Sequence, residues 1–375
     1  MKQKYATTGR VLYPLSLLFF LFLLSCGKPD KKENAKEISE RSINTLASKI
    51  DSILSTNQPR IFNGVILIRQ GKESLYVKEH GYADFENKIP ISINDKFRIM
   101  SNSKQITAVL VLKEVEKGNI DLQKPVGAYL SNLPQSWSDT VTVHQLLNMS
   151  SGISDLEKPL LFKPGNGFHY SNPGYGLLGK IIESVTHKSY ASNANDLFKG
   201  LGMNNTYCYE LQGTNEGLIN GHALLNGDIE VVDFERFGFD QERWDNFLPA
   251  GGIVSDAYDI STWDIKLHHG ELLSQESYQQ MITPTNWGAH AVFDSDTIGY
   301  GYGLRIHDKY PVFHLGHGGR GFGFVSVKFY IPEKDIDVVI WENIYHMDNF
   351  PNNADVIYHF ENEIRKIILN SDLVK

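Results

Sequence analysis

The chain has 375 residues, of which 41% are hydrophobic and 11% aromatic, so it can bury a sizeable core and is not a disordered chain. Its formal net charge is −8, which argues against nucleic acid as a partner, because binding to phosphates needs a basic surface. It has two cysteines, too few thiols for a zinc or iron–sulfur site of cysteine ligands.

The first residues are typical of a secretory signal. Three basic residues precede the apolar run Val11–Leu24, which is too short to span a bilayer comfortably. Ser25 and Cys26 follow, and this junction resembles the lipobox of bacterial lipoproteins. The resemblance implies a signal peptide over residues 1–25, a lipid on Cys26, and an exported protein anchored to a bacterial membrane as a periplasmic or outer-membrane lipoprotein. The alternative is an ordinary signal peptide with a chance cysteine.

The rest of the chain is predicted to be a tether over residues 26–37 and one domain over residues 38–372. The tether is polar and has no hydrophobic periodicity. In the domain, periodicity predicts helices over 43–54, 103–116, 143–149, 175–185 and 354–369, and strands over 64–69, 74–80, 300–306, 312–315, 324–330 and 336–341. Hairpin connections at both ends predict a mixed α/β (α+β) fold: one antiparallel sheet formed from both chain ends, flanked by N- and C-terminal helices, with a large, mostly helical insertion.

The first chemical candidate is the S-x-x-K pair Ser101 and Lys104, where an extended segment meets a helix. Residues three apart share a helix face, so the amine can reach the hydroxyl and activate it. The helix N-terminus also offers N–H groups to a developing negative charge. The motif alone is weak, and a helix cap is the other interpretation of Ser101.

The second candidate is the Y-x-N sequence of Tyr170 and Asn172, which lies between a glycine-containing loop and a helix. A tyrosine facing a cleft can carry a proton if its pKa falls, and Lys104 nearby would lower that pKa. Asn172 can orient Lys104 and donate to a substrate carbonyl. The other interpretation is an aromatic side chain packed under a loop.

The third candidate is the glycine-rich segment containing His317, Gly319 and Arg320. Glycines let a substrate backbone approach a strand, and His317 can supply a donor or a cation. A tight turn with a surface histidine is the alternative. We expect no metal site, since His314 and His317 would face opposite sides of a strand. No G-x-S-x-G, Walker or dinucleotide-binding sequence is present.

In this order the three elements resemble the serine β-lactamase and penicillin-binding-protein superfamily, and Y-x-N resembles its class C β-lactamase branch, with the related DD-peptidases, D-aminopeptidases and esterases. Further segments that resemble the family are 81–104, 141–153, 170–179, 201–203 and 249–252. The resemblance covers roughly residues 60 to 345.

The resemblance implies that Ser101 forms an acyl-enzyme, that Lys104 and Tyr170 act as base and then acid, and that Asn172 contacts Lys104 and substrate. It implies an oxyanion hole made by the N–H groups of Ser101 and Arg320, and no cofactor. His317 stands where a class C β-lactamase is expected to carry lysine, which favours a D-amino-acid peptide or carboxylic ester over a β-lactam as substrate.

Two alternatives stay open: a dedicated β-lactamase, and a catalytically silent lipoprotein that binds a cell-wall ligand. The expected partners are a small-molecule or peptide substrate and the membrane, through the lipid. The sequence carries no signal for oligomeric state.

Overall fold

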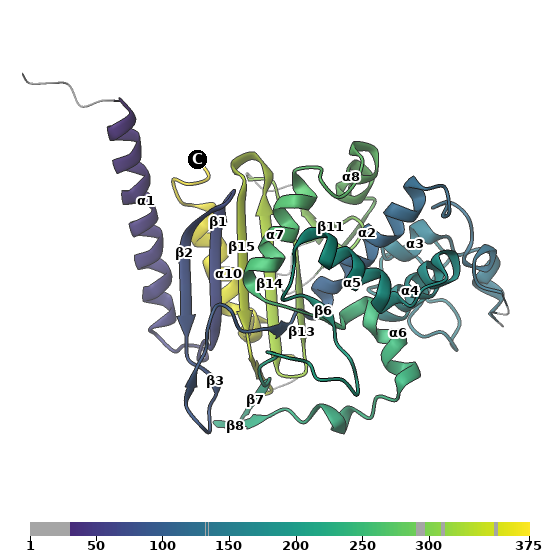
Figure 1. Ribbon diagram of the computed structural model, residues 1–375, viewed down its shortest axis with the longest axis horizontal. Helices are drawn as coiled ribbons and strands as arrows, with labels where there is room; N and C mark the ends of the chain where they lie inside the picture. The colour runs from purple at the N-terminus through teal and green to yellow at the C-terminus, as the bar shows by residue number, and fades with distance from the viewer. Residues whose placement is uncertain (1–30, 132, 134, 290–296, 309–311, 349–351) are drawn as a thin grey trace, which may run out of the picture. The chain divides into compact units, whose positions relative to one another are not determined.

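A computed structural model of the protein describes residues 31–375 except 132, 134, 290–296, 309–311 and 349–351 (Figure 1). Two units can be distinguished, Met1–Glu40 and Arg41–Lys375, and the fold described below is that of the second. The apolar run of the signal and Cys26 lie outside the described residues, so the domain boundaries stay predictions. None of the helices in the described ranges combines the length and apolar character needed to cross a bilayer.

The centre of the fold is an antiparallel sheet to which eight strands of the described residues contribute. Both ends of the chain supply strands, because β1 pairs with β15 over Gly64↔Glu342 to Gln70↔Ile336, which confirms the predicted arrangement. The order is β10 (Asn286–Ala289), β11 (Thr297–Tyr300), β12 (Arg305–His307), β13 (His314–Gly321), β14 (Phe324–Ile331), β15 (Ile336–Glu342), β1 (Gly64–Gln70) and β2 (Glu73–His80).

Both faces of this sheet are covered, so its central strands are apolar on both sides. In β1, Val65 and Leu67 belong to the core under the helical insertion, while Ile66 and Ile68 belong to the core that includes residues of α1 and α10. This alternation follows from the two-residue repeat of a strand. In Figure 1, α7 crosses one face of β15 and α10 lies behind the sheet.

The helices account for the remaining layers. Those of the insertion are α2 (Ser103–Glu116), α3 (Val143–Leu147), α4 (Asn172–Thr186), α5 (Tyr190–Leu201), α6 (Gln241–Gly251), α7 (Ala257–His268) and α8 (Gln275–Ile282). Those near the chain ends are α1 (Lys31–Leu54), α9 (Ala354–Ile357) and α10 (His359–Leu369). A 3-10 turn, η1 (Met100–Asn102), joins β5 to α2.

Short strands outside the main sheet form three small sheets among the described residues. They are β3 (Tyr82–Asp84) with β4 (Ile89–Pro90); β5 (Phe97–Arg98), β9 (Ile253–Ser255) and β6 (Tyr207–Cys208); and β16 (Ile344–His346), β7 (His222–Leu225) and β8 (Asp228–Val231). The β5–β9 pair matters most for the site, because it brings the segment before Ser101 against the segment that follows α6.

The structure differs from three sequence-based expectations. The strand expected over residues 300–306 is interrupted by a turn, in which Gly303 approaches α2 so closely that a Cβ would lie 2.7 Å from the carbonyl oxygen of Lys104. The closing helix breaks at Tyr358. The helix α1 starts at Lys31 and includes part of the expected tether, a stretch rich in Lys, Glu and Ala, which are good helix formers.

Candidate active site

The predicted nucleophile Ser101 lies on the 3-10 turn η1, directly before the long helix. Met100 next to it has a φ of 49°, in the left-handed region that costs a non-glycine residue about 1 kcal/mol or more. Two hydrogen bonds hold the turn: Ser326 Oγ donates to the carbonyl of Ile99 at 2.8 Å, and the Asn102 amide donates to Ser326 Oγ at 3.0 Å. The sheet strand β14 therefore fixes the nucleophile turn.

Lys104 points back at Ser101 from the first turn of α2. Its Nζ lies 3.1 Å from Ser101 Oγ and donates to the carbonyl of Ala250 at 2.7 Å. The side chain has no exposed surface, and burial together with the charge of Arg305 holds the pKa of Lys104 well below its usual value. A depressed pKa favours the neutral amine, whose nitrogen has a lone pair that can accept the serine proton.

Tyr170 completes the cluster from the loop before α4. Its hydroxyl shares a hydrogen bond with Ser101, and its ring centroid lies 4.8 Å from Lys104 Nζ. Burial raises the pKa of Tyr170 to about 12, although the bond to Ser101 and the charge of Arg305 each act to lower it. The expectation that the pKa of Tyr170 would fall is wrong, because burial raises it by more than the neighbouring groups lower it. Burial thus favours the neutral form of both the amine and the phenol.

Gly319 marks the closest approach of β13 to the nucleophile. A Cβ at this position would lie 2.7 Å from the backbone nitrogen of Ser101, so any larger residue would push the strand away. The first N–H groups of a helical segment have no partner within it and can bind a developing oxyanion. The two segments expected to supply the oxyanion hole are thus in contact, while the roles of the N–H groups of Ser101 and Arg320 stay a prediction.

His317 lies within the strand and has no exposed surface. Its Nδ1–H donates to the carbonyl of Gly318 at 2.7 Å, and Nε2 lies 3.1 Å from the hydroxyl oxygen of Tyr300. The imidazole centroid is 6.0 Å from that of Tyr170. Both imidazole nitrogens thus lie against protein groups, the carbonyl of Gly318 and the hydroxyl of Tyr300, and tyrosine rings connect the imidazole to the cluster. A direct contact of His317 with substrate stays a prediction.

Asn172 and Arg320 lie at the edges of the cluster. Asn172 is the first residue of α4, is exposed, and lines a cavity of about 590 Å³. The Lys104 amine, which Asn172 was expected to orient, hydrogen-bonds to Ser101 and Ala250. The guanidinium carbon of Arg320 lies 6.0 Å from the ring centroid of Tyr358. The binding roles of Asn172 and Arg320 stay predictions.

Comparison with known proteins shows the family. The family model described as Beta-lactamase matches residues 46–359. This chain belongs to the β-lactamase family. That membership confirms the predicted family and fold.

Individual relatives of this β-lactamase-family protein include Protein flp of Staphylococcus aureus (strain N315), 25% identical over 308 residues that cover 75% of this chain and 59% of the relative. Penicillin-binding protein 4* of Bacillus subtilis (strain 168) is 28% identical over 307 residues, 72% of this chain and 65% of the relative. The chain thus spans less than two thirds of these curated relatives. A solved D-amino acid amidase from Ochrobactrum anthropi SV3 has a TM-score of 0.72 at 25% identity, covering 87% of this chain and 99% of its own. Together they support a hydrolase.

One buried cation of this β-lactamase-family protein was not predicted from the sequence. Arg305 on β12 has no exposed surface, and none of its three guanidinium nitrogens has a hydrogen-bond partner among the described residues. Its Cζ lies 5.8 Å from the ring centroid of Tyr170 and 5.4 Å from that of Tyr300. Its charge within the otherwise uncharged segment 300–306, which the sequence predicts to be a strand, is the signal that could have singled it out.

Replacing Arg305 with methionine is expected to move the pH dependence of catalysis to higher pH. Without the cation the ammonium of Lys104 is less repelled, so the pKa of Lys104 rises. Because catalysis needs the neutral amine, kcat/KM then rises at a higher pH than in the parent protein. The pKa of Tyr170 also rises, because its phenolate loses an attractive charge. A pH profile of kcat/KM measures the shift.

The same substitution is expected to stabilise the fold by about 1–3 kcal/mol, since unpaired buried donors are lost. Urea unfolding at fixed pH measures this change. An unshifted pH profile in a folded Arg305→Met variant would contradict the electrostatic role.

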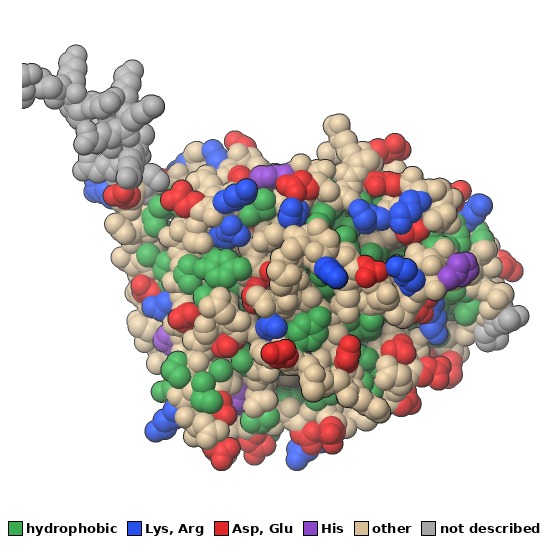
Figure 2. Space-filling model, viewed as in Figure 1, with side chains coloured by type: hydrophobic (Ala, Val, Ile, Leu, Met, Phe, Trp, Pro, Cys, Tyr) green, Lys and Arg blue, Asp and Glu red, His purple; other side chains and the backbone are tan. Residues whose placement is uncertain are grey.

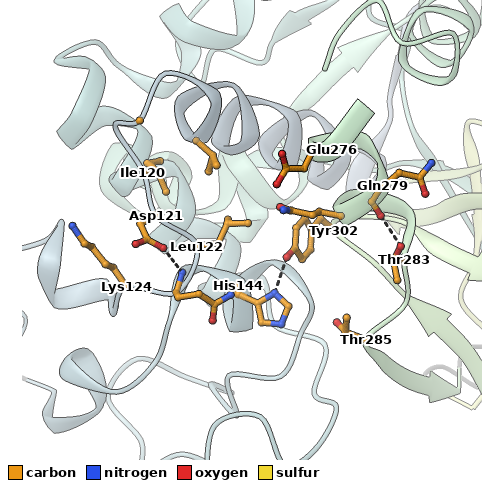
Figure 3. Close-up of a pocket in the computed structure, with 14 residues that line it drawn as sticks. Ile120, Asp121, Leu122, Lys124, His144, Glu276, Gln279, Thr283, Thr285 and Tyr302 are labelled. Atoms are coloured by element: carbon orange, nitrogen blue, oxygen red, sulfur yellow. Dashed lines mark hydrogen bonds between the residues drawn. The ribbon is translucent and has the colours of Figure 1, made fainter. Parts of the chain in front are cut away.

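Another cavity, of about 870 Å³, lies beside α2 and α8 and contains none of the three central residues (Figure 3). His144 Nδ1 and the Tyr302 hydroxyl meet across it at 2.6 Å. Its lining mixes apolar and polar side chains, with Glu276, Gln279 and Thr283 facing Asp121 and Lys124. No group of three metal-ligating side chains occurs within the described ranges. On the face drawn in Figure 2, basic side chains are interspersed with acidic ones, and no large region carries charges of one sign only.

Proposed function

We propose that this protein is a serine hydrolase that cleaves an amide or ester through an acyl-enzyme on Ser101. The observation that carries the proposal is the 3.1 Å contact between Ser101 Oγ and the buried amine of Lys104, whose pKa is depressed. A serine hydroxyl is a poor nucleophile until a base removes its proton, and a neutral amine at this distance is such a base.

In acylation, Lys104 accepts the Ser101 proton while Oγ bonds to the substrate carbonyl carbon. The carbonyl oxygen becomes negative and is stabilised by the N–H of Ser101 and by a second N–H, which we assign to Arg320. The tetrahedral centre then collapses, the bond to the leaving amine or alcohol breaks, and the leaving atom takes a proton from Tyr170. Tyr170 regains its proton from the Lys104 ammonium. A phenol with a pKa of about 12 stays protonated between these transfers, which suits a relay.

Deacylation repeats these steps with water as the nucleophile. Lys104 takes a proton from the water, whose oxygen bonds to the acyl carbon, and Ser101 Oγ leaves with a proton returned through Tyr170. The net reaction consumes one water and needs no cofactor.

The substrate we favour is a D-amino-acid amide or peptide, or a carboxylic ester. The similarity to a D-amino acid amidase and to Penicillin-binding protein 4* supports an amide substrate. A β-lactam is less favoured because His317 is buried and engaged by Tyr300, so this position supplies no exposed cation for an antibiotic carboxylate.

Covalent labelling tests the proposal. A fluorophosphonate or fluorescent penicillin is expected to label Ser101, as shown by peptide mapping, and Ser101→Ala should abolish the label. Ser192→Ala, which changes an exposed serine on α5, is the matched control and should label normally. Labelling elsewhere, or equal labelling of Ser101→Ala, would reject the mechanism. If no labelling is detected but the protein binds a cell-wall ligand, the result would favour the alternative of a catalytically silent lipoprotein.

We also propose that the protein is exported and anchored by a lipid on Cys26. The support is the signal-like start of the chain and the lipobox-like junction before Cys26. Full-length protein expressed in a bacterium should partition into the detergent phase and incorporate labelled fatty acid. Cys26→Ser should do neither, while Cys208→Ser should behave as the parent. Fatty acid incorporation by Cys26→Ser would disprove the assignment.

A further inference from the structure

A cavity of about 590 Å³ opens where the start of α4, the middle of α6 and the loop 154–157 come together. Its volume falls in the range of small-molecule pockets, about 300–1,000 Å³. Two phenylalanines, Phe239 and Phe247, form one wall, and Asn172 and Ser154 lie among the residues that line the rest.

Both helices that bound this cavity also hold the catalytic cluster. Asn172 opens α4 two residues after Tyr170. Phe247 lies on α6 one turn before Ala250, whose carbonyl accepts from Lys104 Nζ at 2.7 Å. A group that extends from an acyl carbon on Ser101 toward Asn172 would therefore run toward this cavity.

The contact between α4 and α6 is tight, so the cavity has a fixed floor. A Cβ on Gly176 would lie 2.5 Å from the carbonyl oxygen of Asn246, and one on Gly179 would lie 2.3 Å from Cγ of Pro249. Only glycine permits helices to pack at this distance. The floor is thus set by backbone, and the selectivity of the cavity depends on its side-chain walls.

The aromatic wall is positioned by further rings and by a cation. The ring centroids of Phe239 and Phe247 are 5.7 Å apart, and that of Phe247 lies 5.9 Å from that of Phe322, in the turn after β13. Arg98, three residues before Ser101, stacks on Phe234 at 4.2 Å. Both wall residues are half-buried, so part of each ring remains available to a ligand.

The rim carries charges of both signs. Asp155 and Glu157 come from the loop, and Lys180 and Arg243 from the two helices. Because these charges offset one another, the rim gives little preference for a charged group, whereas the two half-buried rings favour another ring at 4.5–7 Å.

We propose that this cavity binds the acyl part of the substrate and selects an aromatic acyl group. The proposal rests on the proposed function and specifies its substrate class. An aryl group on the acyl side would pack against Phe239 and Phe247, while the leaving group would lie on the other side of the scissile bond.

Two esters with one leaving group test this selection: p-nitrophenyl phenylacetate and p-nitrophenyl acetate. The protein is expected to prefer phenylacetate by about 10-fold or more in kcat/KM, the scale of a well-filled apolar pocket. Phe247→Ala, which removes part of the wall, and Ser154→Trp, which fills the cavity, should each lower this ratio toward one. Tyr82→Ala, which removes an exposed ring on β3, is the matched control and should leave the ratio unchanged.

The outcomes separate the two proposals. No turnover of either ester and no fluorophosphonate label on Ser101 would overturn the proposed function. If Ser101 is labelled normally but the ratio of kcat/KM for phenylacetate to that for acetate is near one, only the aromatic acyl pocket is overturned. The same holds if both variants leave this ratio unchanged. Because Phe247→Ala could unfold the aromatic wall, Ser154→Trp provides the independent readout, and thermal melts verify that both variants fold.

Discussion

Lys104→Met is expected to lower kcat/KM by about 10⁴-fold, at the upper end of the range for a lost general base. Methionine fills a similar volume but cannot accept the proton of Ser101, whose Oγ lies 3.1 Å from Lys104 Nζ. The fold should be retained, because the amine that is lost hydrogen-bonds to Ser101 and the carbonyl of Ala250, and methionine can keep the packing against the Tyr170 and Tyr175 rings. Steady-state hydrolysis of an activated ester measures the loss.

The pH dependence gives this prediction a second readout. The parent should show kcat/KM rising with pH as Lys104 loses its proton, at a pH well below the usual lysine range, because burial and Arg305 lower its pKa. In Lys104→Met that rising limb should vanish. Lys117→Met, at the exposed end of α2, is the matched control and should retain both rate and limb. A limb that persists in Lys104→Met would assign the base to another group.

Tyr170→Phe is expected to lower kcat/KM by about 10³-fold for amides, within the range of a lost acid. The ring and its packing remain, and only the hydroxyl that hydrogen-bonds to Ser101 is removed. The loss should be smaller for p-nitrophenyl esters, because p-nitrophenolate leaves without a proton whereas an amine must receive one. Rates for an amide and an ester with the same acyl group measure this difference.

The comparison with a remote tyrosine isolates the role of the hydroxyl. Tyr76→Phe removes a hydroxyl that donates to Asp51, away from the site, and should leave both rates unchanged. The rising limb assigned to Lys104 should persist in Tyr170→Phe, since the phenol with a pKa of about 12 stays protonated across that range. Equal losses for amide and ester would contradict the role of Tyr170 as the proton donor to the leaving group.

Local sequence patterns were enough to predict much of the site. The three-residue spacing of Ser101 and Lys104 brings the two side chains together in any helical turn, whatever surrounds it. The helix over 103–116 was predicted with its observed bounds, because the apolar pattern that indicates it stops at Gly118. The resemblance of the ordered motifs to a known family supplied the partner Tyr170, which spacing alone could not have provided.

Other features depend on contacts between distant segments and had no local signal. The left-handed Met100 is held by Ser326 and Asn102, which come from β14 and the nucleophile turn. Arg305 lies on a strand segment that the sequence predicted to be continuous, and the turn before it is set by the approach of Gly303 to α2. Neither could be derived from periodicity, which reports only neighbours along one element.

The sequence by itself determined the two-residue alternation of the sheet strands and the position of the amine beside the serine. It also determined the glycines that allow a neighbouring backbone to approach closely. Each of these features depends on residue type and local geometry. Only the tertiary structure decided in which direction the pKa values of the site shift. Burial lowers the pKa of Lys104 and raises that of Tyr170, and Arg305 acts on both from a strand that lies 201 residues after Lys104 and 135 residues after Tyr170. The physical reason is that desolvation and charge depend on everything folded around a group, which no local pattern encodes.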